Sequence, residues 1–477
     1  MKNYETVIGL EVHVELATKT KIFCSCSTEF GGAPNTHCCP VCTGMPGTLP
    51  VLNKKVVEFA IAAGLATNCT ITQKCKFDRK NYFYPDLPKA YQVSQLYLPI
   101  CRNGHVDIEV DGIQKSIGIH EIHMEEDAGK LVHDEWDDCT LVDYNRCGVP
   151  LIEIVSDPDM RSASEVIAYL EKLKLILQYL GVSDCKMQEG SLRADVNLSI
   201  REVGAPEFGT RTEMKNLNSF KSIARAIEGE RKRQIERLEY GKNIIQETRR
   251  WDDNKDSSFA MRSKEDAQDY RYFPEPDLVP IEISDEWIQA IKENEPELRD
   301  AKMLRYENEY DIPEYDASII TSSKSLADLF EATVSLSVEP KEVSNWIMVE
   351  TMRLLKEHGM DPEQIHFSPE NLAKLIKLIN SNTINRTVAK EVFEIIFTED
   401  IDPDKYVEEK GLKMVNDAGA LRATIEQIVK DNPQSVEDYH AGKTKAMGFL
   451  VGQTMKEMKG KANPAMINEI LLELLNK

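Results

Sequence analysis

The sequence predicts an α+β fold in which a mixed N-terminal domain of strands and helices precedes two all-helical domains. A length of 477 residues corresponds to about three domains at roughly 150 residues each. Short β-rich stretches with glycine and proline punctuation fill the first half of the chain. Beyond residue 294, proline-bounded segments carry apolar residues at helical spacing. We expect domains at residues 1–294, 295–404 and 405–477.

In the first domain, alternating apolar and polar residues predict strands at 6–16, 106–110 and 194–200. A helix is expected to begin after Ser162 or Ser164 and to end at Gly181, because apolar residues between them repeat at a 4,3,4,3 spacing. A second helix is expected from Phe220 to Tyr240.

In the second half, Ser368-Pro369 is typical of a helix start, and apolar residues follow it on one face. The segment 400–404 is acidic and contains a proline, which favours a linker. The last helix is expected to begin at Asn463-Pro464 and to bury Ile467, Ile470, Leu471 and Leu474.

Charge and hydropathy exclude several classes of protein. The chain has 58 basic and 80 acidic residues, a net charge of −22, so its surface as a whole cannot bind a polyanion. Nowhere do 18 apolar residues follow one another, and charged residues interrupt the N-terminal stretch. We therefore expect a cytoplasmic protein with neither membrane nor DNA among its partners. Gly442-Lys443-Thr444 resembles the end of a phosphate-binding loop, but Glu437 stands where that motif requires glycine.

The sharpest local motif consists of two close cysteine pairs, Cys24-x-Cys26 and Cys39-x-x-Cys42, separated by twelve residues. Four thiolates at such spacing are typical of a tetrahedral zinc site, and a site with four sulfurs has no open position for chemistry. We therefore predict a structural zinc knuckle at residues 24–42. Cys38 or His37 is an alternative fourth ligand, and four reduced thiols without metal are the alternative to the whole site.

A second motif places acidic and imidazole side chains on the same face of a strand. The two-residue period of the first strand puts Glu11, His13 and Glu15 on one side of it, and the stretch 120–129 repeats this chemistry with denser charge. Oxygen-rich groups of this kind suit magnesium and phosphate chemistry. Ordinary solvent-facing acids and a structural histidine are the alternative. Further polar residues stand in strand-like contexts: Glu153, Asp195, Asn197 and, after Glu213, Lys215 and Asn216.

Basic residues gather in four places within this acidic chain. Loops 78–86 and 269–276 interleave them with tyrosines, which is typical either of base and phosphate binding or of rigid packed loops. Arg249 and Arg250 are candidate charge clamps. Residues 221–250 hold a net positive excess that faces either RNA or only solvent. Near the C-terminus, five lysines stand with one acid in a stretch that we expect to contact RNA: Lys443, Lys445, Lys456, Lys459 and Lys461.

Taken together, these residues resemble one family closely, the B subunits of tRNA-dependent amidotransferases (GatB) with their archaeal relative. The resemblance covers essentially the whole chain. It is carried by VIGLEVHVEL at 7–16, KFDRKNYFYPD at 76–86, HMEEDAGK at 123–130, PLIEIVS at 150–156, DYRYFPEP at 269–276 and GKTKAMGFLVG at 442–452. Such long, irregular strings are not expected by chance.

The resemblance implies a ligase that forms a carbon–nitrogen bond with glutamine as amido donor. In the family, ATP activates the side-chain carboxylate of misacylated Glu-tRNA(Gln) or Asp-tRNA(Asn), and ammonia then displaces the phosphate. This chain would supply the kinase and transamidase half in its first, cradle-shaped domain. The implied partners are the A and C subunits of the same enzyme, of which the first is a glutaminase that supplies ammonia through a protein channel.

The resemblance also implies roles for particular residues. Magnesium would be held by Glu11, His13 and Glu125, and zinc by Cys24, Cys26, Cys39 and Cys42. The expected catalytic set is Glu11, His13, Glu125, Glu126, Glu153 and Asp195. The residues expected to bind ATP or the aminoacyl end are Arg79, Lys80, Tyr82, Tyr84, Asn197, Lys215, Asn216, Arg249, Tyr270, Arg271 and Tyr272.

Two other classes of function stay open on the sequence. A stand-alone magnesium-dependent phosphohydrolase would account for the acidic strands, but it does not need the basic helix and tail. A non-catalytic RNA-binding protein would use the zinc knuckle and the basic tail, with the acids only structural. It would bind tRNA without turning over ATP.

Overall fold

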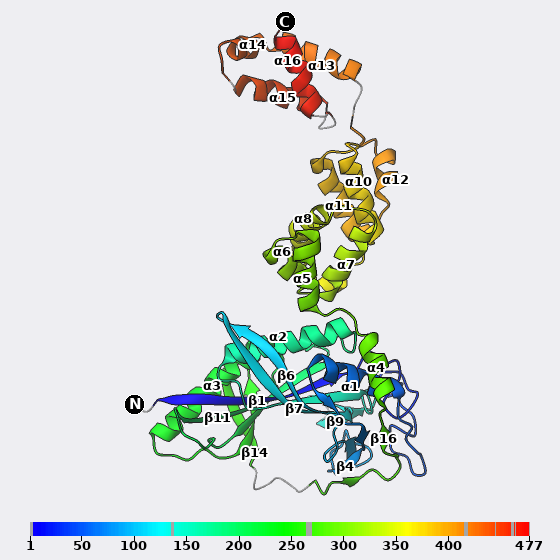
Figure 1. Ribbon diagram of the computed structural model, residues 1–477, viewed down its shortest axis with the longest axis vertical. Helices are drawn as coiled ribbons and strands as arrows, with labels where there is room; N and C mark the ends of the chain where they lie inside the picture. The colour runs from blue at the N-terminus through cyan, green and yellow to red at the C-terminus, as the bar shows by residue number, and fades with distance from the viewer. Residues whose placement is uncertain are drawn as a thin grey trace. The chain divides into compact units, whose positions relative to one another are not determined.

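The computed structural model describes residues 3–134, 138–263, 270–414, 418–443, 445–458, 462 and 464–476. The chain forms two compact units, Met1–Leu298 and Arg299–Lys477. The first combines a large sheet with helices, and the second is helical (Figure 1). The predicted fold class is therefore confirmed. The division of the second half at residue 404 stays a prediction.

Most strands of the first unit form one central sheet. The helices of the unit lie between these strands in the sequence. The strands are β1 (Tyr4–Glu15), β2 (Thr70–Ile71), β3 (Lys74–Cys75), β4 (Asp78–Asn81), β5 (Tyr91–Ser94), β6 (Cys101–Val110), β7 (Ile113–Glu126), β8 (Lys130–Asp134), β9 (Cys139–Asp143), β10 (Pro150–Ser156), β11 (Leu192–Glu202), β12 (Thr212–Lys215), β13 (Glu247–Asp252), β14 (Ser257–Ser263), β15 (Phe273–Pro274) and β16 (Ile281–Glu282). The helices are α1 (Lys54–Ala66), α2 (Ala163–Leu180), α3 (Phe220–Glu239) and α4 (Asp285–Glu293).

The central sheet has nine strands in the order β14-β13-β12-β11-β1-β10-β7-β6-β2. Neighbouring strands are antiparallel, except that β12 and β13 run parallel. Alternation along β1 buries Leu10, Val12 and Val14 in the main hydrophobic core. Helices α1, α2 and α3 pack against the sheet (Figure 1), and their apolar residues complete this core. The side chains on the other face of β1 and its neighbours are mostly polar, and this face carries the candidate site described below.

The two predicted helices of the first unit are present, with recognisable ends. The Ser162 hydroxyl accepts a hydrogen bond from Glu165 N at the start of α2, and Gly181 takes the left-handed conformation (φ 69°) at its end. Helix α3 begins at Phe220, as predicted, and ends one residue before Tyr240. Ser219 caps its first turn in the same way as Ser162 caps α2.

Three smaller sheets lie outside the central sheet, formed by β15-β4-β5, β16-β3 and β8-β9. In the first of them Phe273 pairs with Arg79 and Pro274 pairs with Asp78. The stretches 78–81 and 270–274, which belong to the two segments in which the sequence interleaves tyrosines and basic residues, therefore lie side by side. Residue 269 of the second segment lies outside the described residues. The sequence does not predict this pairing, because almost 200 residues separate its partners.

Every element named among the described residues of the second unit is a helix, and the helices bury two separate sets of residues. Its helices are α5 (Arg299–Tyr310), α6 (Glu314–Ile320), α7 (Lys324–Ser335), α8 (Pro340–Asn345), the π-helix η2 (Trp346–Thr351), α9 (Met352–His358), the short η3 (Pro362–Gln364), α10 (Pro369–Asn380), α11 (Arg386–Glu399), α12 (Pro403–Glu409), α13 (Ala418–Asp431), α14 (Pro433–His440), α15 (Lys445–Glu457) and α16 (Pro464–Leu475). One hydrophobic cluster runs from Tyr306 to Val407, and the other from Leu421 to Leu475.

The helix starts predicted at Pro369 and Pro464 are confirmed. Helix α16 buries Ile467, Ile470 and Leu471, while Leu474 is partly buried. Of the segment 400–404, predicted to be a linker, only residues 400–402 lie between α11 and α12. Val407 of α12 is buried in the same cluster as α11. Asp400 ends α11 in the left-handed conformation, and Asp402 caps α12.

Candidate active site and metal centre

Polar residues from five adjacent strands meet on the face of the sheet opposite the apolar core. Strand register places His13 of β1 opposite Glu153 of β10, and Glu153 opposite His123 of β7. On the other side of β1, Glu11 stands opposite Asp195 of β11. Residues paired across a sheet point to the same side, so the row predicted from β1 extends across its neighbours.

His13, Glu125 and Glu153 form the first close group, and their ligand atoms lie within 4.8 Å of one another. His13 Nε2 is 3.6 Å from Glu125 Oε1 and 3.4 Å from Glu153 Oε2. His123 lies behind them, with Nε2 3.0 Å from Glu153 Oε2. Its other ring nitrogen, Nδ1, is buried with no hydrogen-bond partner and lies 3.6 Å from Glu121 Oε1.

The carboxylates and imidazoles of this group shift one another's pKa. Burial opposes the charged form of His13 and His123, yet the carboxylates around them, above all Glu153, raise the pKa of both. Burial likewise opposes ionisation of Glu153, but the neighbouring imidazoles hold its pKa well below the usual value. The group therefore concentrates negative charge that is balanced by histidine protons, and a bound cation can take the place of those protons.

Glu11, Asp195 and Glu213 form the second close group, on β1, β11 and β12. Asn197 Nδ2 donates to Glu11 Oε1 over 2.9 Å, and Lys215 Nζ lies 2.5 Å from Asp195 Oδ2 and 3.0 Å from Glu213 Oε1. Burial is the first cause that raises the pKa of Glu11, followed by the charge of Glu153. A lysine thus already neutralises part of this second group.

Two arginines flank the first group and share one carboxylate. Arg193 Nη2 lies 3.0 Å from Asp127 Oδ2, and Arg146 Nε lies 3.4 Å from the same oxygen. Burial disfavours the Asp127 carboxylate, but the two guanidinium groups lower its pKa. Burial and the Asp127 charge raise the pKa of Glu15 to about 8. Each arginine remains about one-third exposed, which leaves cationic surface beside the acids.

Tyrosines of the paired loops are positioned beside the acidic residues. Tyr82, Tyr270 and Tyr272 form an edge-to-face row with ring centroids 5.8 and 6.2 Å apart, and Lys80 Nζ lies 4.9 Å from the Tyr270 ring. Burial and the charge of Glu125 raise the pKa of Tyr82 and of Tyr272. The rings therefore lie within electrostatic reach of the first group.

Other residues of these loops have different surroundings. Tyr84 is 53% exposed. Arg271 takes a left-handed conformation (φ 44°), and its carbonyl oxygen accepts from Asn81 Nδ2 over 2.9 Å. Arg79 is held by Glu275 and Asp277 and stacks over Tyr91 at 4.1 Å. The structure therefore uses the Arg79 guanidinium to join β4 to the segment after β15.

Three expected site residues lie away from these two groups. Glu126 follows Glu125 on β7 and lines a separate cavity of about 200 Å³, where it pairs with Lys89. Arg249 stands opposite Met214 on the core side of the sheet and bonds to Ser258 and Glu247. Asn216 Nδ2 donates to the carbonyl oxygen of Trp251 over 3.1 Å.

The two-residue period of the strands shows which of the expected residues cannot lie on the site face, and it also indicates site residues that were not expected. Adjacent residues of a strand point to opposite faces, so Glu125 and Glu126 cannot both face His13. The same period along 120–126 puts His123 beside Glu125, although His123 was not among the expected catalytic residues. Likewise, Arg193 stands two residues before Asp195 on β11, so the period places both on the same face. The orientation of Arg249 instead depends on the parallel pairing of β12 with β13, which the sequence does not reveal.

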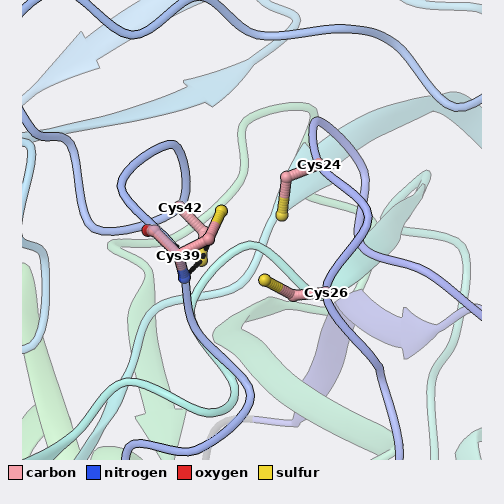
Figure 2. A group of neighbouring side chains, drawn as sticks. All are labelled: Cys24, Cys26, Cys39 and Cys42. Atoms are coloured by element: carbon pink, nitrogen blue, oxygen red, sulfur yellow. Dashed lines mark hydrogen bonds between the residues drawn. The ribbon is translucent and has the colours of Figure 1, made fainter.

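The four cysteines of the predicted knuckle converge from two loops (Figure 2). Their sulfur atoms lie within 4.8 Å of one another, and Cys39 Sγ is 4.0 Å from Cys42 Sγ. Tetrahedral zinc–sulfur bonds of about 2.3 Å imply sulfurs about 3.8 Å apart, so this donor set fits zinc. His37 and Cys38, the alternative ligands, bond instead to the carbonyl oxygens of Glu29 and Asn35.

The tail lysines within the described residues lie on α15 and in the turn before it. Lys443 Nζ is 2.8 Å from Asp438 Oδ1. Lys445 begins α15, Lys456 lies in its last turn, and both are exposed. Lys459 and Lys461 lie outside the described residues. In the part of the chain that the structure describes, no helix combines the length and the apolarity needed to cross a membrane.

Comparison with known proteins extends over the whole chain. Residues 6–289 match the model of the GatB/GatE catalytic domain, and residues 328–475 match that of a GatB domain. The chain is 80% identical to a protein of Lachnoclostridium phytofermentans and 73% identical to one of Agathobacter rectalis, each match covering all of both chains. A protein of Lachnospira eligens is 67% identical, again over both full lengths.

All three relatives are named as the B subunit of an aspartyl/glutamyl-tRNA(Asn/Gln) amidotransferase. The two family models account for both structural units, and the identities extend from one end of the chain to the other. This chain therefore belongs to the GatB/GatE family of amidotransferase B subunits.

Proposed function

We propose that this chain phosphorylates the side-chain carboxylate of Glu-tRNA(Gln), Asp-tRNA(Asn) or both with ATP, and then amidates it with ammonia. The products are Gln-tRNA(Gln) and Asn-tRNA(Asn). The observation that carries this proposal is that the first and the second close group, both rich in carboxylates, lie on one face of the sheet. Arginines, a lysine and tyrosines surround them. Phosphoryl transfer requires this combination of acids for a metal and cations for phosphate.

The carboxylates of these groups fit magnesium, which prefers oxygen ligands and keeps part of its shell for water and phosphate. Glu11, His13 and Glu125 are the proposed ligands, and the closeness of Glu153 to His13 and Glu125 supports its place as a further ligand or partner. Bound there, magnesium supplies positive charge that gathers phosphate oxygens and offsets the charge of phosphoryl transfer.

The chain's own residues orient the two substrates in this proposal. Asn197 fixes the Glu11 carboxylate, and Lys215 fixes that of Asp195. The exposed parts of Arg146 and Arg193 provide guanidinium groups for phosphate oxygens. The row of Tyr82, Tyr270 and Tyr272 offers flat rings against which a base or the aminoacyl end can pack.

The chemistry needs two steps, because a carboxylate oxygen is a poor leaving group. In the first step, a side-chain carboxylate oxygen of the aminoacyl group bonds to the γ-phosphorus of ATP, the bond from that phosphorus to the bridging oxygen breaks, and ADP leaves, giving an acyl phosphate. In the second step, ammonia attacks the acyl carbon, the carbon–oxygen bond to phosphate breaks, and nitrogen loses a proton. Cations that hold phosphate in the first step also stabilise it as a leaving group in the second.

A separate glutaminase is proposed to supply the ammonia, within a complex that holds it as the A chain and also contains a small C chain. The relatives are named as B subunits, which supports a multisubunit enzyme. The exposed lysines of α15 support tRNA binding through the tail, since phosphate contacts rely on exposed cations. The four-cysteine centre is proposed to hold structural zinc, because four thiolates leave zinc without an open position.

The experiment is an amidation assay with this chain co-purified with its A and C subunits. Glu-tRNA(Gln) and Asp-tRNA(Asn) are supplied separately with ATP, magnesium and glutamine, and amide formation is followed by mass spectrometry of the released amino acid. Amide that depends on ATP supports the proposal and identifies the tRNA. Bound tRNA without amide or ATP turnover would favour the non-catalytic RNA-binding alternative. ATP turnover independent of tRNA would favour a phosphohydrolase.

A further inference from the structure

Lys21 is a fully buried lysine beside the four-cysteine centre, with no exposed surface. Its Nζ lies 3.6 Å from Cys42 Sγ and 3.3 Å from the carbonyl oxygen of Tyr144, and it donates to both. Among the residues that the structure describes, no carboxylate oxygen lies within 4.0 Å of this ammonium group. Of the two acceptors of this ammonium group, the one that can carry a negative charge is the Cys42 thiolate.

A buried ammonium group without a counter-charge is strongly unfavourable, whereas one beside an anion is not. Zinc with four thiolates carries two net negative charges, since four charges of −1 exceed the metal's +2. Lys21 and Cys42 line the same cavity of about 200 Å³ as Glu126. Lys89, the other lysine that lines this cavity, is already paired with Glu126. Lys21 and the thiolate centre thus each provide the charge that the other lacks.

We propose that Lys21 is the buried counter-cation of the metal–thiolate centre and a positioning residue that ties this centre to the loop 144–149. The proposal rests on the zinc site proposed above and adds a function for a residue outside the four ligands. Groups that bond to metal ligands tune metal affinity, and their loss commonly lowers it about tenfold to a hundredfold.

The loop held by Lys21 leads directly into the candidate active site. Cys147 Sγ donates to the carbonyl oxygen of Cys42 over 3.1 Å, and Ile22 N donates to that of Gly148 over 3.0 Å. Gly148 N in turn donates to the carbonyl oxygen of Asp127 over 2.9 Å. Asp127 is the residue that holds both arginines. The contacts of Lys21 and its neighbours therefore connect the metal centre with the phosphate-binding side of the proposed site.

The first test compares Lys21→Met with Lys19→Met in the co-purified complex. Lys19 is an exposed lysine two residues away, so it controls for the loss of a lysine in this segment. Zinc content is measured first, and zinc release to a chromogenic chelator is then followed with time. We expect release about tenfold to a hundredfold faster from Lys21→Met and unchanged from Lys19→Met. With Co²⁺ in place of zinc, the sulfur-to-metal absorption bands of Lys21→Met should move to longer wavelength, because Cys42 loses a hydrogen-bond donor.

A second measurement separates a charge role from a packing role. The thermal midpoint of the wild type and of Lys21→Met is determined both with zinc and after the metal has been stripped. Loss of the ammonium group should lower the midpoint of the zinc-loaded complex. The midpoint of the stripped complex should fall less, because Lys21 there faces at most the Cys42 thiolate instead of a centre with two net negative charges.

The outcomes distinguish the inference from the zinc site on which it rests. A wild-type complex that contains no metal at the four cysteines overturns the zinc site and this role of Lys21 with it. A zinc-loaded complex in which Lys21→Met changes neither release nor the cobalt bands overturns the counter-cation role alone. A fall of the midpoint that is as large without metal as with it also overturns the counter-cation role, since packing alone would produce that result.

Discussion

Arg79 of β4 and Glu275, which follows β15, form a two-pronged ion pair. The Nε–Oε2 distance is 2.6 Å and the Nη2–Oε1 distance is 2.8 Å, and Glu275 is almost completely buried. Paired, planar contacts of this kind fix both partners in orientation. They join the two segments whose tyrosines lie beside Glu125. Arg79 was expected to bind substrate, and the geometry supports a positioning role.

Replacement of either partner should therefore have the same consequence. We expect Arg79→Ala and Glu275→Ala to reduce kcat/KM for amidation to a similar extent, because each releases the Tyr270–Tyr272 segment. The double variant should be no worse than either single one, since both remove one shared interaction. Steady-state kinetics on the assembled complex measure this. A direct substrate contact by Arg79 would instead make Arg79→Ala clearly more severe than Glu275→Ala.

Much of the site follows from the sequence, because short-range patterning determines it. The two-residue period of β1 predicts the shared face of Glu11, His13 and Glu15, and cysteine spacing predicts the metal ligands. What the sequence cannot give is strand order. The meeting of Glu125 with His13 depends on β10 lying between β1 and β7, a pairing across more than 100 residues.

The same limit explains why the expected magnesium ligands fall into two groups. Glu11 and His13 share a face of β1, but they stand opposite different partners, Asp195 and Glu153 respectively. Register alone decides this, and register is set by the packing of the buried residues Leu10, Val12 and Val14 on the other face. The fold class was easier to predict, since composition and periodicity change along the chain itself.

Glu125→Ala and Asp195→Ala should abolish tRNA-dependent ATP hydrolysis in the assembled complex while largely sparing glutaminase activity. The first removes a proposed magnesium ligand and the second removes the partner of Lys215. A loss of about a hundredfold or more is expected from such changes to charge stabilisation. Phosphate release with and without tRNA measures it. Glu109→Ala, an exposed glutamate on β6 of the same sheet, is the control and should retain activity. Retained ATP turnover in the two site variants would contradict the assignment.

Glu230 of α3 predicts a specific dependence of stability on pH. The carboxylate is buried and accepts from Arg233 (2.7 and 2.8 Å) and from Thr212 (2.8 Å). Burial opposes its ionisation, but these donors hold its pKa below the ordinary value of 4.5. A depressed pKa in the folded state adds stability above the unfolded value, and this is lost as pH falls through the folded value.

We therefore expect Glu230→Gln to lower the free energy of unfolding by about 1.5–3 kcal/mol at pH 7. The difference from wild type should shrink as pH falls below about 4.5. Urea unfolding at a series of pH values measures this. Glu228→Gln on the same helix is the matched control, because Glu228 is exposed and should contribute little at any pH. A difference that stays constant down to pH 3 would contradict the role of the charge.

Zinc content should equal about one atom per chain and should depend on both cysteine pairs. Cys24→Ser and Cys39→Ser each leave three thiolates, and we expect both to lose the metal, since each pair supplies half of the tetrahedron. Cys38→Ser is the control, because its sulfur bonds to the Asn35 carbonyl oxygen outside the group of four. Elemental analysis of the purified complexes decides the matter. Zinc retained in Cys24→Ser and Cys39→Ser but lost in Cys38→Ser would reassign the ligand set.

Removal of residues 418–477 should weaken tRNA binding without disturbing the first unit. The buried residues from Leu421 to Leu475 form a hydrophobic cluster of their own. The deletion therefore removes the whole cluster and leaves no part of it exposed to water. We expect the truncated complex to keep its glutaminase activity and the thermal midpoint of the first unit, while the Kd for tRNA rises.

Lys445→Glu with Lys456→Glu should reproduce the rise with the fold intact, because two exposed cations on α15 are reversed in charge. The slope of log Kd against log salt should also become shallower than in the wild type, since fewer phosphate contacts release fewer counterions. An unchanged Kd and salt slope in both variants would show that tRNA does not use this tail.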